Sequence, residues 1–202
     1  MRSLLFWLCR HWSRLVLMVM CKLDIKEIEY PTSGRLVLVS NHVSLIDSLI
    51  ISVAINRPMR FVMYYKYYNI PVFKSFFKAL GAIPIAGKSE DPEVFFGAFK
   101  EISSALNNDE AVFIFPEGIL TTTGELCEFK GGIEHILKKT PSPVLPLALK
   151  GLWGSKFSKS KSRSLFSFKR RKVEVIGGCL IQPENCNRIT LKQVIAKLLY
   201  EK

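Results

Sequence analysis

The sequence has no closely spaced pair of cysteines. Its cysteines are five in number, an odd count over 202 residues: Cys9, Cys21, Cys127, Cys179 and Cys186. A disulfide framework or a structural zinc site needs cysteines in pairs at characteristic spacings. We therefore expect neither, and a reducing cytosolic environment fits this cysteine usage best.

The sequence also lacks an uninterrupted apolar run long enough to cross a bilayer, which takes about 20 residues. Residues 3–21 are mostly apolar, but Arg10, His11 and Arg14 interrupt them. These arginines, together with the lack of a small-residue cleavage site, argue against a cleaved signal peptide. On a helix Ser3, Arg10 and Arg14 fall on one narrow face, so we expect a helix that lies in the membrane interface.

A helix buried in the core and a tilted or re-entrant insertion are the alternatives for this segment. Trp7 and Trp12 favour the interface, because tryptophans and basic residues are enriched at the level of the lipid headgroups. We expect residues 1–30 to form a membrane-interacting segment. Residues 31–202 have an ordinary length for one globular domain.

Acidic residues are scarce. There are 17 Asp and Glu against 29 Lys and Arg, which gives a net charge of +12. The expected partners of such a chain are polyanions: nucleic acid, an anionic lipid surface or an acidic carrier protein. The 14 phenylalanines favour a protein that works beside lipid.

The basic residues are densest in residues 156–172, which contain no acid, and we expect this stretch to be a mobile loop. Its only aromatic residues are Phe157, Phe166 and Phe168, which is a poor pattern for stacking on nucleic-acid bases. An anionic membrane surface, at about 1 kcal/mol per basic residue, explains the cluster with fewer assumptions. We therefore expect no nucleic-acid partner.

From residue 35 onward, short β-branched runs alternate with segments of helical periodicity. This alternation predicts an α/β fold with a mostly parallel central sheet flanked by helices. The expected strands are Leu36–Ser40, Met59–Met63, Ala82–Ile85, Ala111–Phe115, Val144–Leu149 and Val173–Ile176. The expected helices are Ser44–Ile55, Pro71–Leu80, Asp91–Leu106, Gly132–Lys139 and one from Thr190 onward.

Two common catalytic or nucleotide-binding motifs are missing. There is no G-x-S-x-G, so a serine hydrolase of the nucleophile-elbow type would lack its nucleophile. The triplet Gly87-Lys88-Ser89 is similar to the end of a phosphate-binding loop, but Gly81 lies one residue too far upstream and no strand leads directly into it.

His42 follows a predicted strand and precedes a predicted helix, with Asp47 five residues later. Side chains five apart do not meet on a helix, so His42 must lie in the preceding loop, where it can turn back onto Asp47. A histidine held by a carboxylate can take a proton from an attacking alcohol. The alternative is a capping box between Ser44 and Asp47, and the residues by themselves favour neither. A metal site would need further ligands, and we expect none.

A second group of residues ends the strand at residues 111–115, in the order Phe115-Pro116-Glu117-Gly118. Ligands bind at the ends of parallel strands in α/β folds. Proline and glycine would hold Glu117 there with little conformational freedom, either to bind a substrate hydroxyl or to orient a base.

Both groups, in this order, resemble the glycerophospholipid (1-acylglycerol-3-phosphate) acyltransferase family. The blocks that carry the resemblance lie between residues 36 and 154, and they include residues 81–85 and 144–148. The resemblance implies an O-acyltransferase domain in residues 31–202. It implies transfer of a fatty acyl chain from acyl-CoA or an acyl carrier protein to a lysophospholipid, with no other cofactor.

The same resemblance implies roles for individual residues. His42 would be the general base and Asp47 would orient it, while Asn41, Glu117 and Gly118 would contact the substrate. The family often has arginines where this chain has Ala86-Gly87-Lys88 and Ile119-Leu120, so Lys88 and Lys130 are the expected phosphate-binding cations. The expected location is the cytoplasmic face of the inner (cell) membrane. The alternative function is a non-enzymatic basic membrane- or RNA-binding module.

Overall fold

A computed structural model of the chain describes residues 2–160 and 170–200. Its strands are β1 (Cys21–Ile25), β2 (Leu36–Ser40), β3 (Met59–Tyr64), β4 (Ile83–Ile85), β5 (Ala111–Ile114), β6 (Val144–Lys150) and β7 (Arg171–Gly177). Its helices are α1 (Arg2–Met20), α2 (Asp47–Ala54), α3 (Tyr65–Tyr68), α4 (Pro71–Leu80), α5 (Pro92–Asn107), α6 (Gly132–Lys139) and α7 (Arg188–Tyr200), with a short 3-10 turn at Pro183–Asn185.

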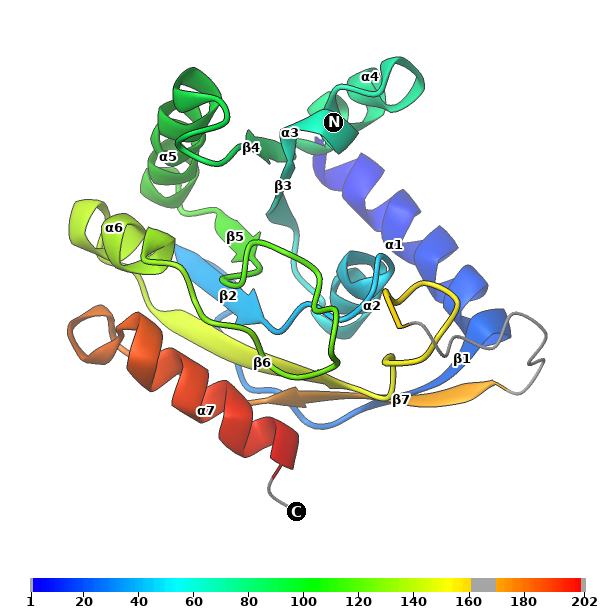
Figure 1. Cartoon of the computed structure of the whole chain (residues 1–202). Coiled ribbons are helices and arrows are strands. Elements are labelled where there is room, and N and C mark those ends of the chain that lie inside the picture. The colour runs from blue at the N-terminus through cyan, green and yellow to red at the C-terminus, as the bar shows by residue number, and fades with distance from the viewer. Residues whose placement is uncertain (1, 161–169, 201–202) are drawn as a thin grey trace.

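The described strands form one sheet in the order β1-β7-β6-β2-β5-β3-β4, shown in Figure 1. Its neighbouring strands run parallel, except that β6 and β7 are antiparallel. The central strand β2 pairs with both β5 and β6, and all five of its residues are buried. The predicted α/β class with a mostly parallel sheet is therefore confirmed.

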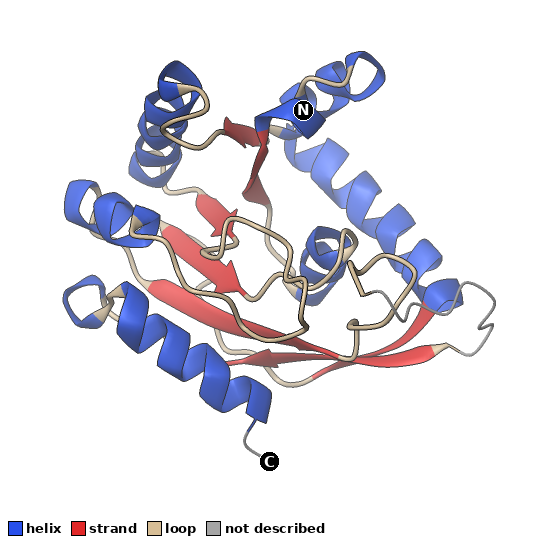
Figure 2. Cartoon of the chain, in the orientation of Figure 1, coloured by secondary structure: helices blue, strands red, loops and turns tan. Residues whose placement is uncertain are grey.

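Alternate residues of the central strands supply two separate cores, because successive side chains of a strand point to opposite faces. Leu38 and Phe113 face one core together with residues of α1 and α2. Val37 and Val112 face the other, which α5, α6 and α7 cover. Helices thus flank both faces of the sheet, as Figure 2 shows.

Two predicted boundaries were wrong. The helix expected from Ser44 begins at Asp47, and the loop expected over residues 156–172 ends earlier, because Arg171 and Lys172 belong to β7. The part of that loop at 161–169 lies outside the described residues. Strand β1 was not predicted; of its residues only Cys21 is buried, and it pairs with β7 at the edge of the sheet.

The first 30 residues include a helix, as expected, and also the edge strand β1. One side of α1 packs on the protein through Phe6 and Leu17, and Arg10 donates a hydrogen bond to the Val53 carbonyl oxygen at 2.9 Å. Arg10 therefore faces the protein, although the sequence placed it on the polar face of an interfacial helix. None of the helices in the described part of the chain has the length and apolarity needed to span a bilayer.

Substitution of Gly34 and of Gly151 by alanine distinguishes the cost of backbone strain from the cost of a steric clash. Both have a positive φ, +91° and +80°, but a Cβ on Gly151 would lie 2.1 Å from the Lys172 carbonyl oxygen, whereas one on Gly34 meets nothing within 4 Å. We expect Gly34→Ala to lower the free energy of unfolding by about 1–2 kcal/mol through backbone strain. Gly151→Ala should cost clearly more in urea unfolding, and equal costs would contradict this packing of β6 against β7.

Candidate functional site

The candidate site lies at the carboxyl ends of β2 and β5. These strands are parallel and in register, with Val39 opposite Ile114, so the residues that follow each strand emerge at the same edge of the sheet. His42 and Glu117, 75 positions apart in the sequence, thereby come into contact. Such an edge is where open α/β sheets bind ligands.

Asp47 is completely buried and holds the turn that follows β2. Its Oδ2 atom lies 2.9 Å from Nδ1 of His42 and accepts hydrogen bonds from the backbone N–H groups of Val43 and Ser44, at 2.7 and 2.9 Å. Burial raises the pKa of the Asp47 carboxyl, while the hydrogen bonds from His42 and the backbone act in the opposite direction.

This geometry joins the two interpretations that the sequence left open. The Asp47 carboxylate contacts His42, and it also accepts the backbone N–H of Ser44 as the acid of a capping box would. Asp47 engages the backbone of residues 43 and 44, and a turn at residues 45 and 46 follows, so α2 starts only at Asp47. The predicted contact between His42 and Asp47 is present, and its catalytic role remains a prediction.

Glu117 holds the main chain of His42. Its Oε1 accepts the backbone N–H of His42 at 2.7 Å, and its Oε2 accepts the backbone N–H of Cys127 at 2.8 Å. The loop containing Glu117 makes a second contact with His42, because the Thr121 N–H donates to the His42 carbonyl oxygen at 3.0 Å. Of the two roles predicted for Glu117, the geometry favours orienting the base.

The imidazole of His42 stacks on Phe115. Their ring centroids are 3.8 Å apart and the planes differ by 10°. Phe115 contacts Phe113 in the core, and Phe113 contacts Phe61, so a row of aromatic rings supports the imidazole from the interior. With Nδ1 held by Asp47 and 20% of the side chain exposed, Nε2 is the ring nitrogen available to a substrate.

Asn41 is placed differently from its predicted role. Its side-chain amide donates to the Leu149 carbonyl oxygen at 3.1 Å and accepts the Leu149 N–H at 2.8 Å. These bonds join the end of β2 to the end of β6. Asn41 is buried, so its demonstrated contact is with the sheet, and its contact with substrate remains a prediction.

Of the two predicted cations, Lys130 lies at the site. A Cβ on Gly118, which has φ +64°, would lie 2.8 Å from Nζ of Lys130. The positive φ favours glycine at this turn, and the Lys130 side chain crosses it. Within residues 2–160 and 170–200 Lys130 makes no ion pair. Lys88 lies in the loop between β4 and α5, with its ammonium 5.9 Å from the Phe96 ring centroid.

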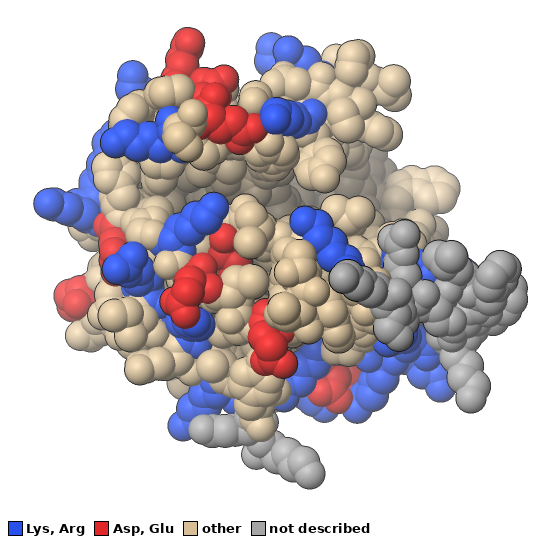
Figure 3. All heavy atoms as spheres, in the orientation of Figure 1, with Lys and Arg blue, Asp and Glu red and all other residues tan. Residues whose placement is uncertain are grey.

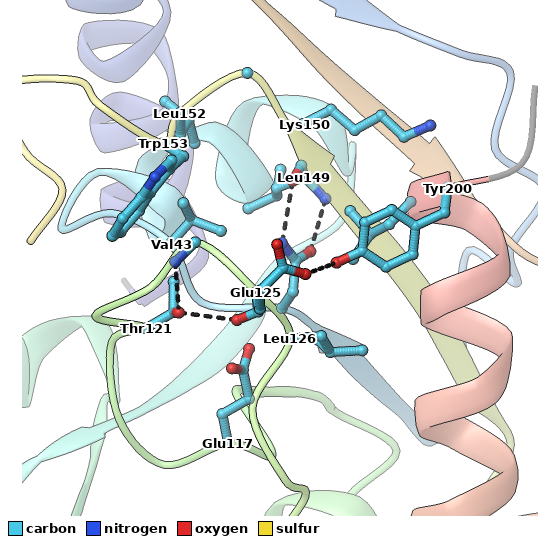
Figure 4. A pocket seen from close by; sticks show the side chains of 14 residues that line it. Val43, Glu117, Thr121, Glu125, Leu126, Leu149, Lys150, Leu152, Trp153 and Tyr200 are labelled. Atoms are coloured by element: carbon cyan, nitrogen blue, oxygen red, sulfur yellow. Dashed lines mark hydrogen bonds between the residues drawn. The ribbon is translucent and has the colours of Figure 1, made fainter. Parts of the chain in front are cut away.

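A cavity of about 170 Å³ lies behind the Glu117 loop, between the end of β6 and α7 (Figure 4). Thr121 in its wall donates to the Glu125 carbonyl oxygen at 2.8 Å and accepts the Gly124 N–H at 3.1 Å. The Tyr200 hydroxyl donates to the Glu125 carboxylate at 2.9 Å. The contact between the C-terminal helix and this loop was not predicted from the sequence, and neither were the roles of Thr121 and of the Phe115 stack.

Metal-ligand clusters are not part of this site. No group of three or more His, Cys, Asp or Glu side chains in the described part of the chain has the proximity needed to hold an ion.

Comparison with known proteins supplies a family. The family model described as "Acyltransferase" matches residues 22–150. A chloroplastic 1-acyl-sn-glycerol-3-phosphate acyltransferase of Brassica napus is 29% identical over 147 residues, which are 72% of this chain and 42% of that protein. A probable 1-acyl-sn-glycerol-3-phosphate acyltransferase of Mycoplasma pneumoniae is 25% identical over 180 residues, covering 86% of this chain and 66% of its own. This chain therefore spans less than half of the Brassica protein.

The fold also has a solved counterpart. The crystal structure of the 1-acyl-sn-glycerophosphate acyltransferase PlsC from Thermotoga maritima superimposes with a TM-score of 0.77 at 19% sequence identity, covering 99% of this chain and 81% of that one.

The bracing role of Glu117 is testable by Glu117→Gln, which keeps the shape and removes one acceptor. One backbone N–H, of His42 or of Cys127, then faces an NH₂ group, so we expect urea unfolding to show a loss of about 1–3 kcal/mol. Glu125→Gln is the control, because its amide oxygen can still accept from Tyr200. If Glu117→Gln unfolds like the unmodified protein, its carboxylate is not a brace.

Proposed function

The chain belongs to the acyltransferase family, and from this premise we propose that it transfers a fatty acyl chain from a thioester to the free hydroxyl of a lysophospholipid. The observation that carries the proposal is the contact between His42 and the buried Asp47 at the end of β2. A general base aimed outward from a rigid sheet edge is the group that an alcohol acceptor requires.

The reaction follows from the placement of the imidazole. As the acceptor oxygen attacks the thioester carbonyl carbon, Nε2 of His42 takes the hydroxyl proton, and Asp47 stabilises the imidazolium that forms. The tetrahedral intermediate then loses its thiolate, which receives the proton back from His42 and leaves as a thiol. The products are an ester and a free thiol, so no acyl-enzyme and no additional cofactor are required.

The acceptor is proposed to carry a phosphate near the reacting hydroxyl. Lys130 supports this, because its ammonium crosses the Gly118 turn without a carboxylate partner in the described part of the chain. Lys88 is a second proposed cation, on the loop before α5. The donor is either acyl-CoA or an acyl carrier protein. Coenzyme A carries negatively charged phosphates and the carrier protein an acidic surface, and either suits a chain of net charge +12.

The proposed location is a membrane surface, on the cytoplasmic face of the inner membrane. The side of α1 that does not face the protein leaves large apolar residues uncovered, among them Leu8, Trp12 and Val19. A lipid acceptor also resides in the bilayer, so attachment brings enzyme and substrate together. The non-enzymatic membrane- or RNA-binding alternative offers no reason for the His42 geometry, and nucleic acid is not a proposed partner.

The first test is acyl transfer from radiolabelled oleoyl-CoA, and from oleoyl acyl carrier protein, to a panel of lysophospholipids. We expect His42→Ala to lower turnover by about 10²–10⁴ while leaving the protein folded, because a positioned base contributes that much. His135→Ala, which removes an exposed histidine of α6, is the matched control. Full turnover in folded His42→Ala would remove the basis of the proposal.

The proposed role of Lys130 predicts a change in substrate binding. We expect Lys130→Gln to raise the KM for a phosphate-bearing acceptor about tenfold or more, with a small change in kcat, because hydrogen bonds to charged groups contribute about 1.5–3 kcal/mol. Lys139→Gln, at the exposed end of α6, serves as the control. An unchanged KM would show that another group binds the phosphate.

A further inference from the structure

Helix α4 is apolar in sequence, yet none of its ten residues is buried. Val72 is 82% exposed, Phe73 49% and Phe76 42%. By contrast, α5 and α6 each bury residues against the sheet. A contiguous apolar surface of this kind on a globular protein marks an interaction site.

The apolar residues of α4 are confined to one side. At about 100° per residue, Val72, Phe73 and Phe76 fall on one arc with the rest of the apolar residues, and Lys74 and Lys78 fall on the opposite arc. Phe77 turns partly inward and stacks near Tyr68 of α3, at a centroid distance of 6.4 Å. The remaining apolar arc faces away from the protein.

Helix α1 extends the same surface. A Cβ on Gly81, which ends α4, would lie 2.8 Å from Cδ of Arg2, so the end of α4 meets the start of α1. Figure 1 shows the two helices adjoining at the side of the sheet where β3 and β4 lie. The exposed large apolar residues of α1 are Leu4, Trp7, Leu8, Trp12, Leu15, Val16, Met18 and Val19.

The segments that form this surface carry basic charges, and the acids beside it come from other parts of the chain: Glu90 pairs with Lys66 of α3, and Glu110 pairs with Arg2 of α1. Residues 1–23 and 59–89, which contain α1, α3 and α4, include no Asp or Glu, although the chain has 17 of them. Lys74 and Lys78 border the apolar arc of α4, and tyrosines of α3 such as Tyr67 are exposed beside it. Figure 3 shows the part of the surface formed by α4 as mostly uncharged, with basic groups and no acidic ones. Apolar residues bordered by lysine and tyrosine suit an anionic lipid surface.

We propose that α4 is a second membrane-binding element, which inserts Val72, Phe73 and Phe76 into an anionic leaflet beside α1. The choice of lipid rests on the proposed function, in which the acceptor is a membrane lipid. The topology relates the position of α4 to that of the candidate site. Strand β3 is parallel to β5 and leads directly into α3 and α4, so α4 is connected to the same edge of the sheet that carries His42. Insertion of α4 would hold that edge close to the headgroups.

The test is flotation with vesicles of phosphatidylcholine, with and without phosphatidylglycerol. We expect the double substitution Phe73→Glu/Phe76→Glu to weaken binding to the anionic vesicles about 10-fold or more, because each phenylalanine loses its burial in the bilayer. Ile189→Glu is the matched control, since Ile189 is 63% exposed on α7, away from this surface. Binding by the double variant equal to that of the control would overturn the inference.

A second measurement separates this inference from the proposed function. Turnover is measured with a short-chain, water-soluble lysophospholipid in the absence of vesicles, where we expect the double variant to match the unmodified protein. Loss of vesicle binding with this turnover retained supports α4 as a membrane element. If neither protein turns over the soluble acceptor, the proposed function fails while the binding result still stands. If the substitutions instead convert a dimer to a monomer and leave vesicle binding unchanged, a second copy covers α4 and the lipid assignment is wrong.

Discussion

The buried Asp47 carboxylate is the group on which the geometry of the site depends. Its Oδ2 atom fixes the His42 ring and the backbone of the turn after β2. Burial raises the pKa of this carboxyl above its value in the unfolded chain. The protonated carboxyl therefore adds to the stability of the native state, in full at a pH below the pKa of the unfolded state. That contribution to stability is lost as the pH rises through the pKa of Asp47 in the folded state. The ionised form of Asp47, which would orient His42 as a base in the proposed reaction, is therefore the form that burial disfavours.

A second buried carboxylate completes the support. Glu117 binds the His42 main chain while Asp47 binds its side chain; Asp47 begins α2, and Glu117 lies in the loop after β5. Both oxygens of Glu117 and Oδ2 of Asp47 have donors, which offsets part of the cost of burial, whereas Oδ1 of Asp47 is buried with no hydrogen-bond partner in the described part of the chain. Phe115 adds a flat apolar contact on one side of the ring. The imidazole is thereby positioned before any substrate arrives, which is the condition for an effective general base.

The molecule separates this polar site from the apolar surface of α1 and α4. The acids that organise the site, Asp47 and Glu117, are buried, whereas residues 1–23 and 59–89 contain no acid at all. Buried carboxylates project little charge beyond their hydrogen-bond partners. Residues 1–23 and 59–89 thus contribute only basic and uncharged groups to the surface, although two buried carboxylates organise the site at the ends of β2 and β5.

The sequence by itself determined the α/β class, because the β-branched runs of β2, β5 and β6 need both faces covered. It also allowed a contact between His42 and Asp47, since five-residue spacing across a loop–helix junction permits it, but it left a capping box between Ser44 and Asp47 equally open. Only the tertiary structure decided the rest. Edge strand β1 exists through its pairing with β7, and Glu117 braces His42 because two distant strand ends meet. The sequence of α4 indicates that one side of the helix is apolar. Whether that side packs against the protein depends on which elements lie beside it in the fold.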